Sequence, residues 1–414
     1  MAARTFLDAS TFLNDCLKVN LPQQTPRTLD QCLGCMVGGA VGDALGYPVE
    51  FNSWSEIKSA CGPRGIREYR LDKRGLAQIS DDTQMSLFTA LGILVGMTRG
   101  SMRGIMGRID TYCRYAYVDW LHTQEWSSRD DSDRRISWLL DVPELYARRA
   151  PGNTCLSAIH CLEEHKPVEN NSCGCGGVMR TAPLALLDYI HQYADGDLNY
   201  CDMCAAEAAR ITHRHPLGFI PSAILNHVLM LILRGDVATR EDLISVFLNA
   251  ARGVGQIKTE DDGFKTYDEL WHQYVSKMES ILSEALRYAD TDMPDVEAIE
   301  RIGGGWTGHE ALAIAAYCSV KHFDSFEEAV ISAVNHSGDS DSTGAICGNI
   351  MGCIHGRKAI PSQFTHRLEL LDVIEEMAHD LWTGCIISEY DSRETPEKQE
   401  WFRKYVLGKW KDLT

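Results

Sequence analysis

The stretch LGCMVGGAVGDALGYPVEF, residues 33–51, carries glycines at positions 34, 38, 42 and 46. A spacing of four places these glycines on one helix face, where the missing side chains let another backbone approach closely. A second row, at positions 344, 348 and 352, lies within NHSGDSDSTGAICGNIMG, residues 335–352. Each glycine costs a helix about 0.5–1 kcal/mol relative to alanine, so close packing must offset the cost. We therefore expect two core helices, packed on each other or on a third.

Apolar residues recur at helical spacing along most of the chain, whereas the alternation typical of strands is almost absent. The predicted fold class is therefore all-α. Besides the two glycine-rich helices, the expected helical segments are residues 82–98, 203–212, 219–234, 239–252, 266–290, 308–321, 324–335, 341–355 and 365–384.

No linker-like stretch divides the chain, so we expect one compact helical domain over residues 32–414, preceded by an N-terminal extension, residues 1–31. Polar stretches at residues 127–135, 163–171 and 258–266 interrupt the helical pattern and are expected to be surface loops.

The composition is that of an ordinary globular protein, with 44% hydrophobic and 24% charged residues among 414. A net charge of -18 argues against general nucleic-acid binding, which needs clustered Lys and Arg. An anionic ligand is still possible, because backbone N–H groups and metal ions can bind it. We count no apolar run of about 20 residues, the length of a membrane span, and expect no membrane association.

The chain has 15 cysteines, and its first twenty residues, MAARTFLDASTFLNDCLKVN, lack a continuous apolar core typical of a secretory signal. We therefore expect mostly free, buried thiols in a cytoplasmic protein. The pairs Cys32 with Cys35 and Cys201 with Cys204 have the CxxC spacing of zinc ligands. Their apolar, helical surroundings and the absence of a neighbouring Cys or His cluster disfavour zinc.

Two acidic clusters stand at the starts of apolar helices. They are Ser80, Asp81 and Asp82 in ISDDTQMSLFTALG, and Asp339, Asp341 and Ser342 in GDSDSTGAI. Capping alone explains a single Asp at such a place, because it accepts hydrogen bonds from free N–H groups and favours the positive end of the helix dipole. Two carboxylates at the buried start of each helix would repel strongly unless a cation lay between them. Such oxygen ligands suit Mg²⁺ or Mn²⁺.

Glu50 adds a carboxylate directly after Pro48, which is expected to end the first glycine-rich helix. An exposed Glu would indicate no function. Glu50, however, lies between the apolar residues Val49 and Phe51, which makes it a candidate acid or base near the metal. An EF-hand calcium loop is excluded for DSDSTG, because Ile350 stands at the twelfth position, where a Glu is required.

Two glycine loops precede further helices. RIGGGWTGHEALAIAAYC, residues 301–318, contains G-x-G-x-x-G, but no apolar strand precedes it, which disfavours a Rossmann dinucleotide site. Such a loop can still hold a diphosphate at a helix N-terminus, and Gly303 and Gly305 are candidates for this role. Trp306 can stack on a base or ribose, or lie in the core. NNSCGCGGVMRTAPLAL, residues 170–186, is the second loop.

His213 and His215 in ITHRHPLG stand at a helix junction, where a lone His is usually structural, and no HExxH spacing recruits them into a zinc site. Taken in order, GDALGYPVEF, SDDTQ, the glycine loop ending in VMR, THRHPLG, GGGW with EAL, and GDSDSTGAI resemble the motifs of the ADP-ribosylglycohydrolase family. The resemblance runs from about residue 32 to 356.

That resemblance implies a single all-α domain and a hydrolase that removes ADP-ribose from modified proteins with a pair of Mg²⁺ ions, or Mn²⁺ in some members. The positions that match the family's metal ligands are Ser80, Asp81, Asp82, Asp339, Asp341 and Ser342. Glu50, seven residues after Asp43, matches its active-site glutamate. The positions that match its ADP-ribose contacts are Ser172, Gly174, Gly176, Met179 and His213.

Under this interpretation the metal pair orients the ribose and positions water for attack at the anomeric carbon, Glu50 handles the proton or shifts to admit substrate, and the four aspartates keep the metals. The substrate would be an ADP-ribosylated protein or a small ADP-ribosyl compound. Cys175 departs from some members, which have Asn there. We expect this difference to affect the details of the phosphate and ribose contacts and to leave the metal site unchanged.

Two other functions stay open. One is a non-catalytic ADP-ribose-binding relative, although the complete metal ligands and Glu50 argue against it. The other is a metal-dependent phosphohydrolase acting on a free nucleotide. The sequence does not identify the acceptor linkage, which can be to Arg, Ser, another side chain or nucleic acid.

Overall fold

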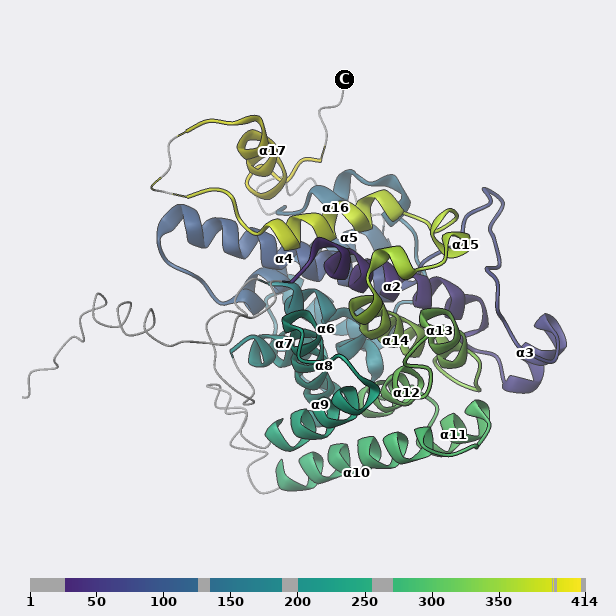
Figure 1. Ribbon diagram of the computed structural model, residues 1–414. Coiled ribbons are helices and arrows are strands. Elements are labelled where there is room, and N and C mark those ends of the chain that lie inside the picture. The colour runs from purple at the N-terminus through teal and green to yellow at the C-terminus, as the bar shows by residue number, and fades with distance from the viewer. Residues whose placement is uncertain are drawn as a thin grey trace, which may run out of the picture.

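A computed structural model describes residues 27–125, 135–187, 200–254, 271–388, 390 and 393–410. Within these ranges every regular element is a helix, and isolated β-bridges are the only strand-type pairing (Figure 1). The predicted all-α fold class is confirmed. Residues 1–26, the polar stretch 258–266 and all but the last residue of 127–135 lie outside the described residues, so the domain boundary at residue 32 stays a prediction.

The α-helices are α2 (Leu29–Gly46), α3 (Trp54–Cys61), α4 (Asp81–Arg103), α5 (Ile109–Glu125), α6 (Asn153–Glu163), α7 (Tyr200–Arg210), α8 (Pro216–Arg234), α9 (Arg240–Gly253), α10 (Trp271–Ala289), α11 (Asp295–Ile302), α12 (Gly308–Lys321), α13 (Phe326–Val334), α14 (Ser340–His355), α15 (Ser362–Thr365), α16 (Leu371–Thr383) and α17 (Pro396–Tyr405). Short 3-10 helices are η1 (Tyr47–Val49), η2 (Trp138–Asp141), η3 (Pro143–Leu145), η4 (Cys175–Arg180), η5 (Ala182–Leu186) and η9 (Arg357–Ala359).

Helices α2 and α14 pack backbone against backbone at the centre of the fold (Figure 1). A Cβ added to Gly38 would lie 2.3 Å from the carbonyl oxygen of Gly348, and one added to Gly42 would lie 1.9 Å from that of Gly344. Only glycine fits at such distances. The sequence predicts that the two glycine-rich helices pack on each other or on a third helix, and the structure shows the first of these alternatives.

The glycine pairs run in opposite order along the two helices. Gly34 faces Gly352, whereas Gly46 faces the backbone of Ser340 at the start of α14. The two helices are therefore antiparallel, and the end of α2 lies beside the first turn of α14. Since Glu50 follows α2 by a few residues, this packing brings it next to the second acidic cluster.

Three of the described helices are long and apolar enough to cross a membrane, by length and composition alone, which corrects the expectation that no run reaches that length. They are residues 29–49, α4 and α8, and 83%, 72% and 94% of their apolar windows are buried inside the protein. Glycines and a few polar residues interrupt the apolar residues of these helices, so no continuous apolar run is seen although the mean hydropathy of each helix is high. Packing within the core accounts for their apolar character.

Candidate active site

The first acidic cluster begins at the N-cap of α4, where Asp43 of α2 holds the backbone. The N–H of Ser80 lies 2.9 and 3.0 Å from the two carboxylate oxygens of Asp43, and the N–H of Thr83 donates to the same group at 3.1 Å. The Thr83 hydroxyl donates to it as well. Burial raises the pKa of Asp43 to about 6, although the hydrogen bonds from Thr83 and Ser80 lower it. Asp43 thus supports the turn that carries the first cluster, a role the sequence did not reveal.

The remaining N–H groups of this turn also have acceptors other than the cluster's own carboxylates. Asp81 donates its N–H to the carbonyl oxygen of Arg149 at 3.1 Å, and Asp82 donates to Oγ of Ser80 at 3.2 Å. Capping therefore explains Ser80 but not Asp81 or Asp82. Oδ2 of Asp82 is buried and makes no hydrogen bond.

The second cluster lies at the start of α14. Asp339 is the N-cap, and one carboxylate oxygen accepts the N–H of Ser342 at 3.2 Å. Asp341 Oδ1 accepts the same N–H at 2.9 Å. The other carboxylate oxygen of Asp339 accepts a hydrogen bond from the Cys175 thiol at 2.7 Å. Cys175 therefore contacts a predicted metal ligand directly, which the resemblance did not indicate.

The two clusters and Glu50 converge. Carboxylate oxygens of Glu50, Asp339 and Asp341 lie within 4.8 Å of one another, and all three residues are buried. The charge of Asp82 raises the pKa of Asp341, and Ser342 is a hydrogen-bond partner of Asp82, which places the start of α4 against the start of α14. Segments far apart in the chain thus form one acidic cluster.

Burial and mutual repulsion raise the pKa of every carboxyl in this cluster. For Glu50 burial comes first, followed by the charges of Asp339 and Asp81, and together they raise its pKa to about 8. The pKa values of Asp81, Asp82 and Asp341 are raised well above the usual range, again chiefly by burial. The cost of ionising these groups together is what a bound cation would remove.

The donor set fits a hard divalent cation. Glu50 Oε2 and Asp82 Oδ2 are buried without a hydrogen-bond partner. In the part of the chain that the structure describes, no Lys, Arg or His forms an ion pair with these cluster carboxylates, so no protein cation compensates them. Buried carboxylate oxygens with unused lone pairs are the ligands that Mg²⁺ and Mn²⁺ prefer.

The two glycine loops join beside this cluster. Gly174 and Thr307 form an antiparallel bridge, and the N–H of Cys175 donates to the carbonyl oxygen of Trp306 at 3.2 Å. The loop of residues 303–308 also packs on the turn before α14, because the N–H of Asp339 donates to the carbonyl oxygen of Gly304 at 2.9 Å. Both loops therefore border the carboxylates.

Four of the residues predicted to bind ADP-ribose gather around the first loop. An added Cβ on Gly174 would lie 3.2 Å from Nε2 of His213, and one on Gly176 would lie 2.9 Å from its Cε1. Ser172 Oγ accepts the N–H of Gly174 at 3.3 Å. Burial and the charge of Arg180 lower the pKa of His213 to about 3, so its ring is neutral. Only small residues fit between this ring and the loop.

Met179 links this loop to the acidic cluster, since Oγ of Ser342 donates to the Met179 sulfur at 3.8 Å. Gly305 has φ of +79°, which favours glycine, and its added Cβ would lie 2.9 Å from the Thr343 side chain and 3.3 Å from that of Asp339. Gly303 instead follows the last residue of α11 and lies against Glu310 in the first turn of α12. Gly305 therefore borders the cluster more closely than Gly303.

Trp306 is not a core residue, since 44% of its surface is exposed. Its ring stacks on Phe51, which is 70% exposed, with ring centroids 5.7 Å apart and planes inclined by 20°. Phe51 directly follows Glu50, so two exposed aromatic rings lie next to the buried acidic cluster. The structure thus selects the exposed alternative for Trp306, while its contact with a base or ribose stays a prediction.

The family model described as ADP-ribosylglycohydrolase matches residues 24–389. With this match over most of its length, and with an all-α fold that brings the family's motifs together, the chain belongs to the ADP-ribosylglycohydrolase family. The family consists of hydrolases that act on ADP-ribosyl substrates and is generally metal-dependent, and the buried acidic cluster agrees with that property.

Similar proteins span nearly the whole family domain. The ADP-ribosyl-(dinitrogen reductase) glycohydrolase of Rhodospirillum rubrum is 29% identical over 83% of this chain and 92% of its own. ADP-ribosylhydrolase ARH3 of Danio rerio is 22% identical over 86% and 90%. A solved structure named as an ADP-ribosylglycohydrolase-related protein complex has a TM-score of 0.56, with 22% identity over 86% of this chain and 98% of its own, and shows the shared fold.

Proposed function

We propose that this protein is a metal-dependent hydrolase that cleaves the N- or O-glycosidic bond between ADP-ribose and a protein side chain, releasing ADP-ribose. The observation that carries the proposal is the buried cluster of Glu50, Asp82, Asp339 and Asp341, with unpartnered oxygens on Glu50 and Asp82. Several similar proteins are named as ADP-ribosylhydrolases or as an ADP-ribosyl glycohydrolase, which supports an ADP-ribosyl substrate.

Two Mg²⁺ ions, or Mn²⁺, would be held by six residues: Ser80, Asp81, Asp82, Asp339, Asp341 and Ser342. Metal ions bound there would act as Lewis acids that stabilise negative charge. They would also lower the pKa of water, so that a nucleophile is available at neutral pH. The starts of α4 and α14 each contribute three of these residues, so the site exists only when the two helices are packed together.

Glu50 is the group that moves the proton. It touches the cluster from the side of η1, and in the metal-free protein burial and the charges of Asp339 and Asp81 raise its pKa to about 8. Burial, the first of these causes, favours the protonated form, which can donate to the departing side chain. The departing side chain needs a proton as the glycosidic bond breaks, and oxocarbenium character develops on the ribose.

The glycine loops hold the ADP-ribose part. Gly174 and Gly176 leave open backbone beside the neutral ring of His213, and Gly305 lets residues 303–306 approach Asp339. Trp306 offers an exposed aromatic face for the base or ribose. This arrangement would place the ribose between the loops and the carboxylates.

The proposal is tested with proteins ADP-ribosylated on Arg and, separately, on Ser, with and without Mg²⁺ or Mn²⁺. We expect Asp82→Ala and Asp341→Ala to lower the release of ADP-ribose on the order of 10³-fold, corresponding to the several kcal/mol that a metal ion supplies. Asp242→Asn is the matched control. Asp242 also lies in the first turn of a helix, α9, but there its carboxylate accepts the N–H of Thr239 at an exposed site.

Three outcomes contradict the proposal. Full activity in Asp82→Ala or Asp341→Ala excludes the assigned metal site. Release of phosphate from free nucleotides in place of ADP-ribose indicates a phosphohydrolase. Tight ADP-ribose binding without turnover of either linkage indicates a non-catalytic relative.

A further inference from the structure

A segment near the C-terminus supports the strand-like stretch that leads into α4. Ala77 donates its N–H to the carbonyl oxygen of Arg367 at 2.7 Å, and Glu369 donates its N–H to the carbonyl oxygen of Ala77 at 3.0 Å. Ala77 and Leu368 also form a parallel bridge. Residues 367–369 therefore fix the backbone immediately before the first acidic cluster.

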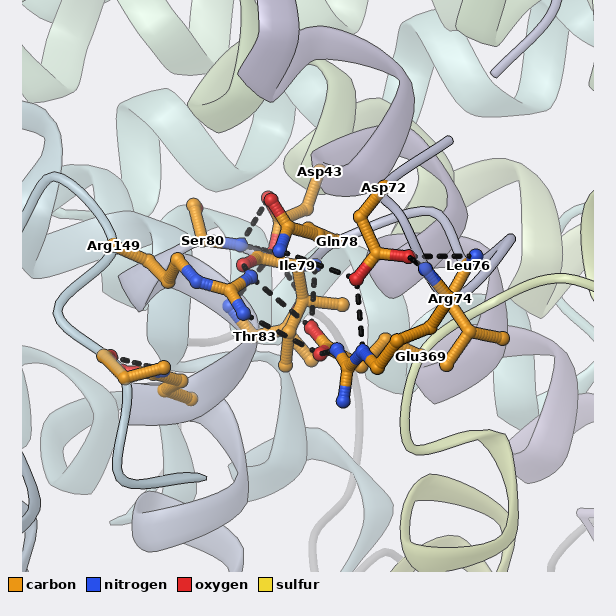
Figure 2. A network of polar contacts seen from close by, with 12 residues as sticks. Asp43, Asp72, Arg74, Leu76, Gln78, Ile79, Ser80, Thr83, Arg149 and Glu369 are labelled. Atoms are coloured by element: carbon orange, nitrogen blue, oxygen red, sulfur yellow. Dashed lines mark hydrogen bonds and ion pairs between the residues drawn. The ribbon is translucent and has the colours of Figure 1, made fainter. Parts of the chain in front are cut away.

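The Glu369 side chain is 2% exposed, and donors surround its carboxylate (Figure 2). Oε2 accepts from Nη1 of Arg149 at 3.1 Å and from the N–H of Ile79 at 3.3 Å. Oε1 accepts from Nη2 of Arg149 at 3.4 Å and from Arg74, whose Nε is held by Asp72 at 2.9 Å. Both oxygens are committed to these donors, so Glu369 is not a metal ligand.

Arg149 holds the turn on two sides. Its Nη1 donates to the carbonyl oxygen of Ile79 at 3.2 Å, and its own carbonyl oxygen accepts the N–H of Asp81 at 3.1 Å. Figure 2 shows the guanidinium lying between the Glu369 carboxylate and the 79–83 backbone. The ion pair with Glu369 therefore fixes the side chain that in turn fixes this peptide segment.

Five consecutive backbone N–H groups are satisfied without the carboxylates of Asp81 and Asp82. The acceptors, in order for residues 79 to 83, are Glu369, Asp43, the carbonyl oxygen of Arg149, Ser80 Oγ and Asp43. The Asp81 and Asp82 carboxylates are therefore not needed to cap α4. Asp81 accepts the backbone N–H of Gly152, and Oδ2 of Asp82 is left for another ligand. Partners of this kind, which orient metal ligands, commonly change metal affinity about 10–100-fold when they are removed.

We propose that Glu369 is a positioning residue of the metal site: through Arg149 and Ile79 it holds Asp81 and Asp82 in place while touching neither metal nor substrate. The inference rests on the proposed function, because it concerns the same metal site. It assigns a role to a residue that follows the last metal-binding motif in the chain and belongs to none of the family motifs quoted above.

The test is binding of Mn²⁺ alone, measured by electron paramagnetic resonance on the full-length chain without substrate. We expect Glu369→Gln to weaken Mn²⁺ binding about 10-fold, since glutamine keeps the size but loses the charge and replaces one of the two acceptor oxygens by an NH2 group that faces other donors. Turnover of the ADP-ribosylated protein should recover when the metal concentration is raised, with KM for that substrate unchanged. A residue that only supports the fold would not give this recovery.

Asp380→Asn is the matched control, because it breaks another buried ion pair, that of Asp380 on α16 with Lys404 on α17. It should lower the melting temperature and leave Mn²⁺ affinity as in the wild type. If Glu369→Gln does not fold, Arg149→Lys replaces it, because lysine keeps the charge but lacks the planar guanidinium whose two Nη atoms contact both oxygens of Glu369. The expected loss of Mn²⁺ affinity is the same.

The outcomes separate the two proposals. Wild-type Mn²⁺ affinity in a destabilised Glu369→Gln or Arg149→Lys overturns the positioning role and leaves the proposed function standing. No Mn²⁺ binding by the wild-type protein overturns the metal site itself, and the positioning role with it, before any variant is compared.

Discussion

The starts of α4 and α14 have the same appearance in sequence but are built differently. At α14 the acidic residues cap their own helix, because Asp339 and Asp341 both accept the N–H of Ser342. At α4 Ser80 caps only the N–H of Asp82, and the other caps come from elsewhere in the chain, with Asp43 accepting the N–H groups of Ser80 and Thr83. The carboxylates of Asp339 and Asp341 therefore cap α14 and also belong to the acidic cluster, whereas those of Asp81 and Asp82 are not needed to cap α4.

The difference shows how a fold can tolerate a concentration of buried negative charge. Each helix start provides a positive dipole end, which favours anions. At α4 the Asp82 carboxylate does not cap the backbone, so its Oδ2 remains unpartnered, while Asp81 accepts the backbone N–H of Gly152. Remote residues thus take over the structural role and leave the nearby ones available for chemistry.

The largest effect should come from separating the two starts. A Cβ on Gly42 would lie 1.9 Å from the carbonyl oxygen of Gly344, so Gly42→Ala must push α2 away from α14. Overpacking in a core typically costs about 1–3 kcal/mol, and here backbone cannot yield as a side chain would, so we expect a loss at or above that range. Urea denaturation followed by circular dichroism measures it.

Gly152→Ala is the control, because nothing lies within 4 Å of its added Cβ and its φ of -61° suits alanine. Equal stability of the two variants would show that the helices do not pack as closely as described. Loss of Mn²⁺ binding in a Gly42→Ala protein that still folds would show that the acidic starts have moved apart.

The glycine rows let the sequence predict the central packing, because glycines four residues apart destabilise a helix unless another backbone packs closely against that face. Periodicity located most helices, but the expected segments do not include α3, α5, α6, α11, α15 and α17. In α5 the buried residues Ile109, Cys113, Tyr117 and Trp120 do have helical spacing, although polar residues between them weaken the signal. In α17 charged residues dominate, and its burial depends on contacts such as that of Lys404 with Asp380.

The cluster residues could be named from the sequence, because acidic pairs at apolar helix starts are costly without a ligand. Their supports could not. Asp43 is a single acid within a glycine row, and Glu369 and Arg149 lie in segments without a motif. Their roles arise from contacts between parts of the chain that only the folded structure brings together.

The second effect is a dependence of stability on pH. A carboxyl whose pKa is higher in the folded than in the unfolded chain stabilises the fold fully below the unfolded value of about 4, and this contribution is lost as the pH rises through the folded pKa. The folded pKa is about 6 for Asp43 and about 8 for Glu50. The free energy of unfolding of metal-free protein should therefore fall between about pH 4 and pH 8.

Saturating Mg²⁺ should reduce this fall, because the metal binds the deprotonated carboxylates and only in the folded protein. Asp119, whose pKa burial raises to about 7, lies outside the cluster and should keep its part of the pH dependence with Mg²⁺ present. Urea denaturation at several pH values, with EDTA or with Mg²⁺, measures both parts. An identical slope in the two conditions would argue against metal binding at the cluster.

The smallest effect compares the two starts directly. Both Asp82→Ala and Asp339→Ala remove one buried carboxylate from the metal-free cluster, but only Asp339→Ala also removes an N-cap. Since a lost cap costs about 1 kcal/mol, metal-free Asp339→Ala should be less stable than Asp82→Ala by roughly that amount in urea denaturation. Asp339→Asn should recover the difference, because its side-chain oxygen can still accept the N–H of Ser342. Equal stability of the two alanine variants would mean that both starts are capped in the same way.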